Sequence, residues 1–329
     1  MKQFFRQRWF LITLLGVMAV GVCFCGVLEP LAKMKVLRQG IVAAVLFLMA
    51  LPLEATAMWK SMRRPWPPLL AVLVNVGLLP LFAWGISQGL EADLGAGLLV
   101  AAVTPCTLAS ASVWTRRAGG NDTVSILVTV ITNLFCFLIT PLWLGIMMAD
   151  RLGASNLQKE LEFGAMAIKL ALLVVLPMSL AQLLRLDKRF AEWATKQKPA
   201  TSILAQCGIL SMVLLGAINV GLRLKDPSQP SLNLLQIGVM LAAVCLVHVT
   251  MLYTGVGIAK LLRFTREDRI AVAFAGSQKT LTVGLLVAMS LGVSILPMVW
   301  YHVSQLFIDT LIADRFRNTS ASEGRESAD

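Results

Sequence analysis

Apolar residues run along the chain in stretches of about 20, separated by short segments that hold charged residues, Gly or Pro. A helix of that length crosses the hydrocarbon core of a bilayer. With charges and helix breakers as boundaries, the pattern predicts an all-α polytopic membrane protein with ten transmembrane helices. Their expected ranges are 9–28, 39–58, 68–87, 94–117, 121–149, 163–186, 201–222, 233–257, 268–290 and 292–312.

The two ends of the chain lie outside these ranges. Residues 1–8 are basic and residues 313–329 are polar, so we expect a short cytoplasmic N-terminus and a disordered cytoplasmic tail around a transporter domain at 9–312. The first apolar run also resembles a signal peptide. It is long enough to span a bilayer and no small-residue cleavage site follows it, so we take it as the first helix.

Composition supports a membrane protein. Hydrophobic residues make up 57% of the 329 residues, charged residues 14%, and the mean hydropathy is +0.76. Soluble domains carry about 25% charged residues. The net charge of +11 is therefore a poor indication of nucleic-acid binding, and its distribution is more informative.

The basic residues indicate an orientation. With the N-terminus inside, 20 of the 29 Lys and Arg residues fall in cytoplasmic segments and seven on the opposite side, while Lys169 and Lys279 lie within spans. Cytoplasmic loops are enriched in Lys and Arg. We expect a protein of a bacterial-type inner cell membrane with both termini in the cytoplasm.

Ten spans divide into two repeats of five, at about 9–149 and 163–312, and an odd number of helices inverts the second repeat. Inverted repeats are typical of secondary transporters. The fourth span of each half is interrupted, by Pro105 in LLVAAVTPCTLASASVWT and by the polar run in AVAFAGSQKTLTVGLLVA. We expect two broken helices, spans four and nine, with a binding site between them.

Lys279 is the residue that requires an explanation first. A lysine near the bilayer centre costs at least ~2.5 kcal/mol on insertion scales, so it needs a partner or a role. Its ammonium could fill a cation site, bind an anionic substrate or titrate. The alternative is a lysine without a functional role, whose side chain extends to the bilayer surface.

Other polar residues in the predicted spans could bind an ion or substrate. They are Asn75, Thr107, Ser110, Ser112, Ser125, Thr129, Thr132, Asn133, Gln278 and Thr280. Four of them follow one helical stripe from Ser125 to Asn133, although a single Ser or Thr in a membrane helix often bonds its own backbone.

Three further ionisable residues, His248, His302 and Asp309, are candidate proton-relay residues. A neutral packing role is the alternative for both histidines. Glu54, Lys169 and Asp309 lie close enough to predicted span ends to reach lipid headgroups. The six cysteines and two histidines show no metal-ligand spacing, so we expect no cofactor or metal beyond a coupling ion, sodium or proton.

Two stretches carry a resemblance to a known family. TPCTLASASVWTRRAGGNDTVSILVTVITNLFCFLITPLWL resembles the fourth and fifth helices of the bile acid:sodium symporter superfamily, and FAGSQKTLTVG with YHVSQ resembles its divergent SBF-like branch. The resemblance implies a core domain of spans three to five and eight to ten, a panel domain of spans one, two, six and seven, and a crossing of helices four and nine.

The resemblance also implies two sodium sites, which this chain matches in part. Ser125 and Thr129 match the first site directly, whereas its Ser-Asn pair falls on Ala111 and Ser112, so any sodium here would use Ser112, Ser125 and Thr129. At the second site Asn75 stands for a Gln.

Two departures at the second site argue against sodium coupling. Phe274 takes the place of the family Glu, and Lys279 the place of an Asn. Loss of a negative ligand and gain of a positive charge disfavour a bound cation.

The sequence thus predicts a secondary transporter, favoured as a monomer, that moves a small organic anion such as a bile-acid-like carboxylate or sulfonate. No HExxH, nucleophile elbow or P-loop indicates an enzyme. The alternative is a regulator of ion homeostasis, calcium above all, on a transporter scaffold, as the resemblance implies for eukaryotic members of the branch.

Overall fold

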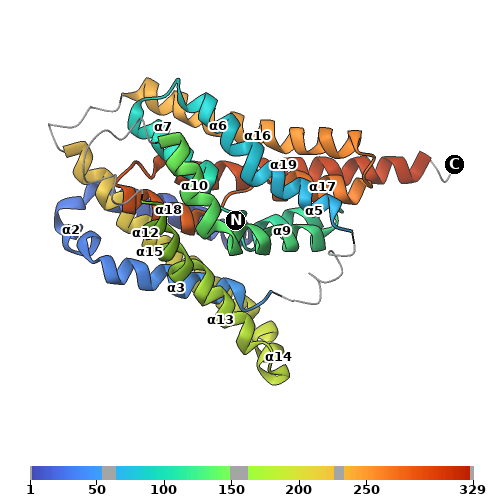
Figure 1. The fold of residues 1–329 in the computed structure, drawn as a ribbon, viewed down its shortest axis with the longest axis horizontal. Coiled ribbons are helices and arrows are strands. Elements are labelled where there is room, and N and C mark those ends of the chain that lie inside the picture. Colours follow the sequence, from blue (N-terminus) through green and yellow to red (C-terminus); the bar gives the residue numbers. More distant parts are fainter. Residues whose placement is uncertain (1, 54–63, 149–161, 226–232, 327–329) are drawn as a thin grey trace.

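The computed structural model describes residues 2–53, 64–148, 162–225 and 233–326, and these residues are almost entirely helical (Figure 1). The elements are α1 (Lys2–Cys23), α2 (Cys25–Lys33), α3 (Lys35–Ala50), α5 (Trp66–Leu73), η1 (Val74–Leu78), α6 (Leu79–Ser87), α7 (Ala92–Val103), α8 (Ser110–Arg117), α9 (Asp122–Leu134), α10 (Cys136–Met148), α12 (Phe163–Leu170), η2 (Ala171–Val175), α13 (Leu176–Leu184), α14 (Lys188–Lys196), α15 (Lys198–Lys225), α16 (Leu234–Leu261), α17 (Arg266–Ser277), α18 (Leu281–Leu291) and α19 (Leu296–Glu326). The segments η1 and η2 are single π-helical turns.

Two groups of helices pack side by side. In the first, which we name the α15 group, α15 contacts α1, α2 and α3, and α13 contacts α3. In the second, the α17 group, α17 contacts α5, α8, α9 and α16, while α19 contacts α7, α8 and α16. Figure 1 shows the first group at the lower left and the second at the upper right.

The helices are those of a protein that crosses a membrane several times. Among the described residues, five helices are long and apolar enough to span a bilayer, or up to seven if each sharply bent pair forms one span. The prediction of an all-α polytopic membrane protein is confirmed. Ten spans in two inverted repeats stay a prediction.

Both expected helix breaks are present. In the first, α7 ends at Val103 and α8 begins at Ser110; in the second, α17 ends at Ser277 and α18 begins at Leu281. All residues from Ile270 to Ala288, on both sides of the second break, are buried, although a helix that faces lipid would expose one side. The breaks therefore lie inside protein, where an unwound backbone can find partners.

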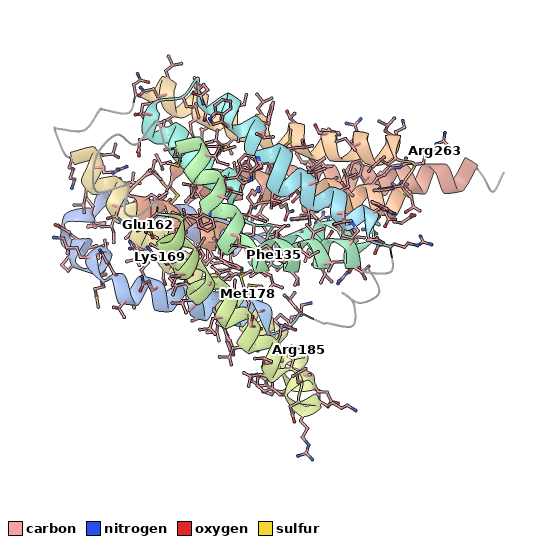
Figure 2. All side chains as sticks on the ribbon, viewed as in Figure 1. Phe135, Glu162, Lys169, Met178, Arg185 and Arg263 are labelled. Atoms are coloured by element: carbon pink, nitrogen blue, oxygen red, sulfur yellow. The ribbon has the colours of Figure 1, made fainter. Side chains whose placement is uncertain are left out.

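Two bends depart from the straight spans expected at 9–28 and 121–149. The chain turns by 101° between α1 and α2, at Phe24. It turns by 66° between α9 and α10, at Phe135, which Figure 2 labels. Neither position is Gly or Pro, which is why the sequence pattern gave no sign of them.

The tail expected to be disordered from residue 313 continues α19 instead, as far as Glu326. No proline follows Pro297, and the exposed Arg117 guanidinium on α8 makes two 2.8 Å hydrogen bonds to the Asp314 carboxylate. These bonds hold the pKa of Asp314 below its usual value of 3.8. The pair links α19 to α8, although an exposed ion pair adds little stability.

A close contact between α7 and the start of α19 generates the first prediction. A Cβ atom at Gly97 would overlap the Ser294 carbonyl oxygen and lie 2.9 Å from Cγ of Pro297. We expect Gly97→Ala to destabilise the protein by about 1–3 kcal/mol through overpacking, measured as a lower melting temperature in detergent.

Gly145→Ala on α10 is the matched control, because a Cβ there meets nothing within 4 Å. It should leave the melting temperature unchanged or raise it, since Ala favours a helix over Gly. Equal melting temperatures for the two variants would contradict the close contact.

Candidate functional site

The two helix breaks meet in the interior of the α17 group. The backbone N–H of Thr280, in the break between α17 and α18, donates a 2.9 Å hydrogen bond to the carbonyl of Pro105, in the break between α7 and α8. Thr107, Gln278 and Thr280 are all buried. The residues between the four half-helices therefore form one polar cluster, which we name the crossing.

The ammonium of Lys279 lies at the centre of this cluster. Its side chain is fully buried, and Nζ donates to the Asn75 carbonyl at 2.7 Å, the Thr104 carbonyl at 2.8 Å and Oδ1 of Asn75 at 3.1 Å. Three acceptors match the three N–H bonds of an ammonium. None of the three is a carboxylate, so neutral oxygens surround the positive charge.

Local backbone structure supplies these oxygens. In the π turn η1 the N–H of Leu79 bonds to the Val74 carbonyl, and the next donor in that pattern is Pro80, which has no N–H. The Asn75 carbonyl is thereby left for Lys279. Thr104 is the residue that ends α7, where the helix dipole is negative and favours a cation.

Side chains from two elements, η1 and α19, satisfy the unwound backbone between α17 and α18. Nδ2 of Asn75 donates to the carbonyls of Ala275 at 3.0 Å and Gln278 at 2.9 Å. The Tyr301 hydroxyl donates to the Ser277 carbonyl at 2.9 Å. The Gln305 amide accepts from the Lys279 N–H and donates to the Lys279 carbonyl.

Three members of the predicted ion-binding stripe form hydrogen bonds with the unwound backbone between α7 and α8. Oγ1 of Thr132 accepts from the Cys106 N–H, Nδ2 of Asn133 donates to the Cys106 carbonyl, and Oγ1 of Thr129 donates to the Thr107 carbonyl, over 2.9–3.1 Å. Such bonds stabilise an unwound helix in a bilayer, where an unpaired backbone group costs several kcal/mol. In this conformation Thr129, Thr132 and Asn133 form hydrogen bonds with the protein's own backbone.

The residues proposed for a sodium ion have separate partners. The Ser125 and Thr115 hydroxyls lie 2.7 Å apart, and Ser112, half-buried, donates to the Ala109 carbonyl in its own helix. Thr129 bonds to the Thr107 carbonyl. The structure thus brings Ser110 and Thr107 into the crossing and leaves Ser112 at its edge.

Gln278 connects the crossing to a buried acid–base pair. Its Oε1 accepts hydrogen bonds from Thr107 at 2.7 Å and Ser110 at 2.8 Å, and its Nε2 donates to Oδ2 of Asp309 at 2.6 Å. Oδ1 of Asp309 lies 2.9 Å from Nε2 of His248, and both side chains are fully buried. The sequence expectation that Asp309 reaches headgroups is wrong, because α16 and α17 cover it.

The His248–Asp309 pair is held by groups on both sides. Nδ1 of His248 lies 3.3 Å from the Ser277 carbonyl, and Nε2 lies 2.9 Å from Oδ1 of Asp309. Because Oδ2 accepts from Gln278, both carboxylate oxygens of Asp309 have a partner.

The other ionisable candidates lie elsewhere. His302 accepts from Gln305 at 3.1 Å and packs edge-on against Phe10 of α1, so it faces the α15 group rather than His248. Lys169 is half-buried on α12, and Glu54 lies outside the described residues. Only His248 and Asp309 of the three predicted relay residues contact each other.

Sequence reasoning missed Tyr301 and Gln305 as functional positions. A signal was present, because Tyr301, Gln305 and Asp309 follow each other at intervals of four, which places them on one face of a helix. Thr115 and Thr140 were missed without such a signal. Thr140 bonds to the Val103 carbonyl, a contact over 37 residues.

Comparison with known proteins places this arrangement in a family. Residues 8–318 match the SBF-like CPA transporter family. The chain belongs to this family. Membership confirms the resemblance seen in the sequence and makes the chain a membrane transporter rather than an enzyme.

Relatives of this SBF-like chain are similar over most of its length. Escherichia coli YfeH is 28% identical over 72% of this chain and 70% of its own length. The uncharacterized sodium-dependent transporter YocS of Bacillus subtilis is 25% identical over 84% of this chain and 83% of its own. Sodium/bile acid cotransporter 7 of Xenopus tropicalis is 21% identical over 95% and 92%.

Phe274, which takes the place of the family carboxylate, lies among apolar side chains. Phe274 is fully buried in an apolar cluster with Leu252, Ile270 and Ile312, and its ring packs against Phe316. A cation ligand at this position would have to be built into an apolar core.

The contacts of Lys279 generate a second prediction. Lys279→Met keeps the length of the side chain but leaves the Asn75 and Thr104 carbonyls without a donor. Each unsatisfied buried acceptor costs about 1–3 kcal/mol, so the melting temperature in detergent should fall clearly.

Lys260→Met, at the exposed end of α16, removes one lysine without breaking these contacts. It should melt like the unmodified protein. An unchanged melting temperature for Lys279→Met would show that its three bonds do not hold the crossing together.

Proposed function

We propose that this chain is a secondary transporter that moves a small organic anion by alternating access and couples to protons instead of sodium. The observation that carries the proposal is the Lys279 ammonium, which occupies an oxygen-lined position at the crossing. Ten spans in inverted repeats, both termini in the cytoplasm and a bacterial-type cell membrane belong to the same proposal.

The ammonium disfavours sodium at this position. Its oxygen ligands are those a hard cation prefers, yet each already accepts a hydrogen bond from Nζ. A second cation at ~4 Å would be repelled by about 4 kcal/mol at an effective dielectric of 20. Phe274 provides no negative charge to offset this repulsion.

The His248–Asp309 pair is the proposed carrier of the coupling proton. It is fully buried, and Gln278 joins it to the hydroxyls of Thr107 and Ser110 at the other helix break. A change in the pair's protonation would therefore alter the hydrogen bonds that connect the two breaks. In alternating access this connection would move with the α17 group against the α15 group, which correspond to the proposed core and panel domains.

The name of one relative supports an anionic cargo, and the names of two relatives mention sodium, so coupling has to be tested. The Xenopus tropicalis relative is named for sodium and bile acid, and the Bacillus subtilis relative for sodium. A bile-acid-like carboxylate or sulfonate is thus the first cargo to test here. Saturable uptake into proteoliposomes would separate a transporter from a regulator of ion homeostasis, which would show none.

Sodium coupling is tested without knowledge of the cargo. The purified chain should melt at the same temperature in sodium chloride and in choline chloride. The double variant Lys279→Asn with Phe274→Glu should melt higher in sodium chloride, because bound sodium stabilises only the folded protein, by about 2.7 kcal/mol at 100 times its dissociation constant.

Each single variant serves as a control and should show a smaller sodium effect than the pair. A sodium-dependent rise in the unmodified protein would contradict the proposal, whether or not the double variant folds.

Proton coupling is tested on α19. Asp309→Asn removes the carboxylate proposed to carry the proton, so accumulation of cholate driven by a pH gradient should be lost while exchange of cholate across the membrane continues. Asp314→Asn is a matched control on the same helix, with an exposed carboxylate, and should accumulate cholate normally. Equal loss in both variants, or in neither, would argue against the His248–Asp309 pair as the proton carrier.

A further inference from the structure

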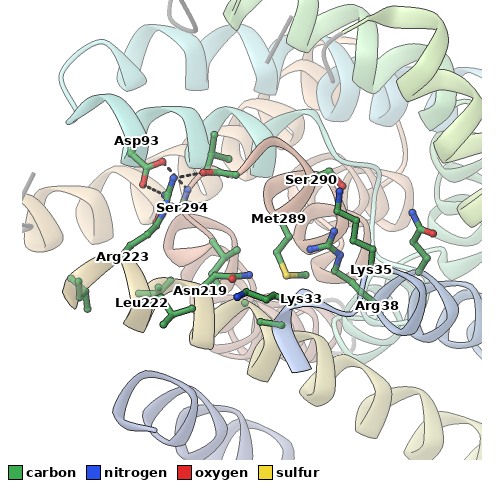
Figure 3. Close-up of a pocket in the computed structure, with 18 of the residues that line it drawn as sticks. Lys33, Lys35, Arg38, Asp93, Asn219, Leu222, Arg223, Met289, Ser290 and Ser294 are labelled. Atoms are coloured by element: carbon green, nitrogen blue, oxygen red, sulfur yellow. Dashed lines mark hydrogen bonds and ion pairs between the residues drawn. The ribbon is translucent and has the colours of Figure 1, made fainter. Parts of the chain in front are cut away.

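A cavity of about 650 Å³ lies between the two helix groups, away from Lys279 (Figure 3). The α15 group contributes residues of α2, α3 and α15, and α12 adds Lys169. The α17 group contributes the start of α7 and the connection between α18 and α19. Small-molecule sites usually have volumes of about 300–1,000 Å³, so the cavity is large enough for a ligand.

The wall of the cavity is strongly basic. Its charged residues are Lys33, Lys35, Arg38, Lys169 and Arg223 against Glu91 and Asp93. Both acids have partners at the start of α7: the Glu91 carboxylate accepts from the N–H groups of Asp93 and Leu94, and the Asp93 carboxylate from Arg223. Lys33 pairs with Glu29, which does not line the cavity. The wall itself holds five basic residues against two acidic ones, with Lys35, Arg38 and Lys169 on the side of α3 and α12.

The charges are arranged unevenly. Figure 3 shows Asp93, Arg223 and Ser294 joined at one end and Lys35 with Arg38 beside Ser290 at the other, with Met289 between them. Val220, Leu222, Val293 and Ile295 provide apolar surface. A basic end next to apolar wall suits a ligand that has an acidic group on an apolar body.

These basic residues are the main exceptions to the charge asymmetry of the chain. Of the seven Lys and Arg residues assigned to the non-cytoplasmic side, four line this one cavity: Lys33, Lys35, Arg38 and Arg223. Headgroup contact is a poor explanation for Arg38, whose exposure is only 9%. Arginine in a buried setting is suited to carboxylate and sulfonate groups, because its planar fork donates two parallel hydrogen bonds.

We propose that this cavity is an outward-facing capture site for an amphipathic organic anion, a carboxylate or sulfonate. Lys35, Arg38 and Lys169 bind the acidic group, and Met289 with Val293 contacts the apolar body. Arg38 and Lys169 already have interactions of their own, which the anion joins or replaces. The inference rests on the proposed function only in taking an organic anion as cargo.

Calorimetry on the full chain in nanodiscs tests the site without any transport step. Naphthalene-2-sulfonate should bind with a measurable dissociation constant, and its uncharged analogue naphthalene-2-sulfonamide at least about tenfold more weakly, because a charge-assisted hydrogen bond is worth about that factor or more. Lys35→Gln and Lys169→Gln should each weaken sulfonate binding about tenfold, again the effect of one lost charge-assisted bond.

Lys225→Gln is the matched control. It removes one exposed lysine from the same end of α15 that carries Arg223, yet Lys225 does not line the cavity. Sulfonate binding should be unchanged. Equal binding of sulfonate and sulfonamide, or equal weakening by Lys225→Gln and Lys35→Gln, would overturn the capture site.

The two proposals fail separately. If sulfonate binding follows the pattern expected and proton-driven uptake is absent, the capture site stands and the proposed function fails. If uptake occurs and Lys35→Gln and Lys169→Gln bind sulfonate as the unmodified chain does, the capture site is wrong and the cargo binds elsewhere.

Discussion

The structure depends on one constraint: two helices are unwound inside the protein, and every exposed backbone group of each break needs a partner that water cannot supply. Lys279 and Asn75 meet part of that requirement together, since the Asn75 amide bonds to carbonyls of one break while the Lys279 ammonium bonds to Asn75 and to the Thr104 carbonyl at the end of α7. A deeply buried lysine is thus compatible with a stable fold, because its charge is stabilised by carbonyl dipoles and a helix terminus. The Lys279 bonds tie η1 and the end of α7 to the break between α17 and α18.

This arrangement separates two roles that sequence reasoning had assigned to one residue. An anion could reach the Lys279 ammonium only by displacing acceptors that the two breaks need, and the residue is fully buried. The basic cavity holds its positive charge at the interface between the helix groups, where a ligand has room. Lys279 therefore fits the role of a fixed internal cation, and the proposed contacts with cargo fall to Lys35, Arg38 and Lys169.

Sequence predicted the features whose causes are local. Pro105 and the polar run from Gly276 to Thr280 mark both breaks, because the lack of a backbone donor and the clustering of polar residues act within one turn. The bend at Phe135 has no local cause, and the covering of Asp309 by other helices depends on packing between segments more than 30 residues apart. The partners of Thr129 and Thr132 could not be predicted for the same reason. A stripe of hydroxyl groups has the same sequence pattern whether it binds an ion or the unwound backbone of a neighbouring helix.

The positions of the basic residues separate two effects: the enrichment of Lys and Arg on the cytoplasmic side, which sets orientation, and the clustering of Lys and Arg around one cavity. Orientation requires that bases gather on the cytoplasmic side, and it gives no reason for the bases that remain on the other side to lie together. Lys33, Lys35, Arg38 and Arg223 come from segments up to 190 residues apart, yet they share one cavity wall with Lys169. Close packing of like charges is unfavourable, and this wall holds five basic residues against two acidic ones. The remaining positive potential is attractive to an anion, and its position between the two helix groups means that a bound anion would contact both of the units that alternating access requires to move.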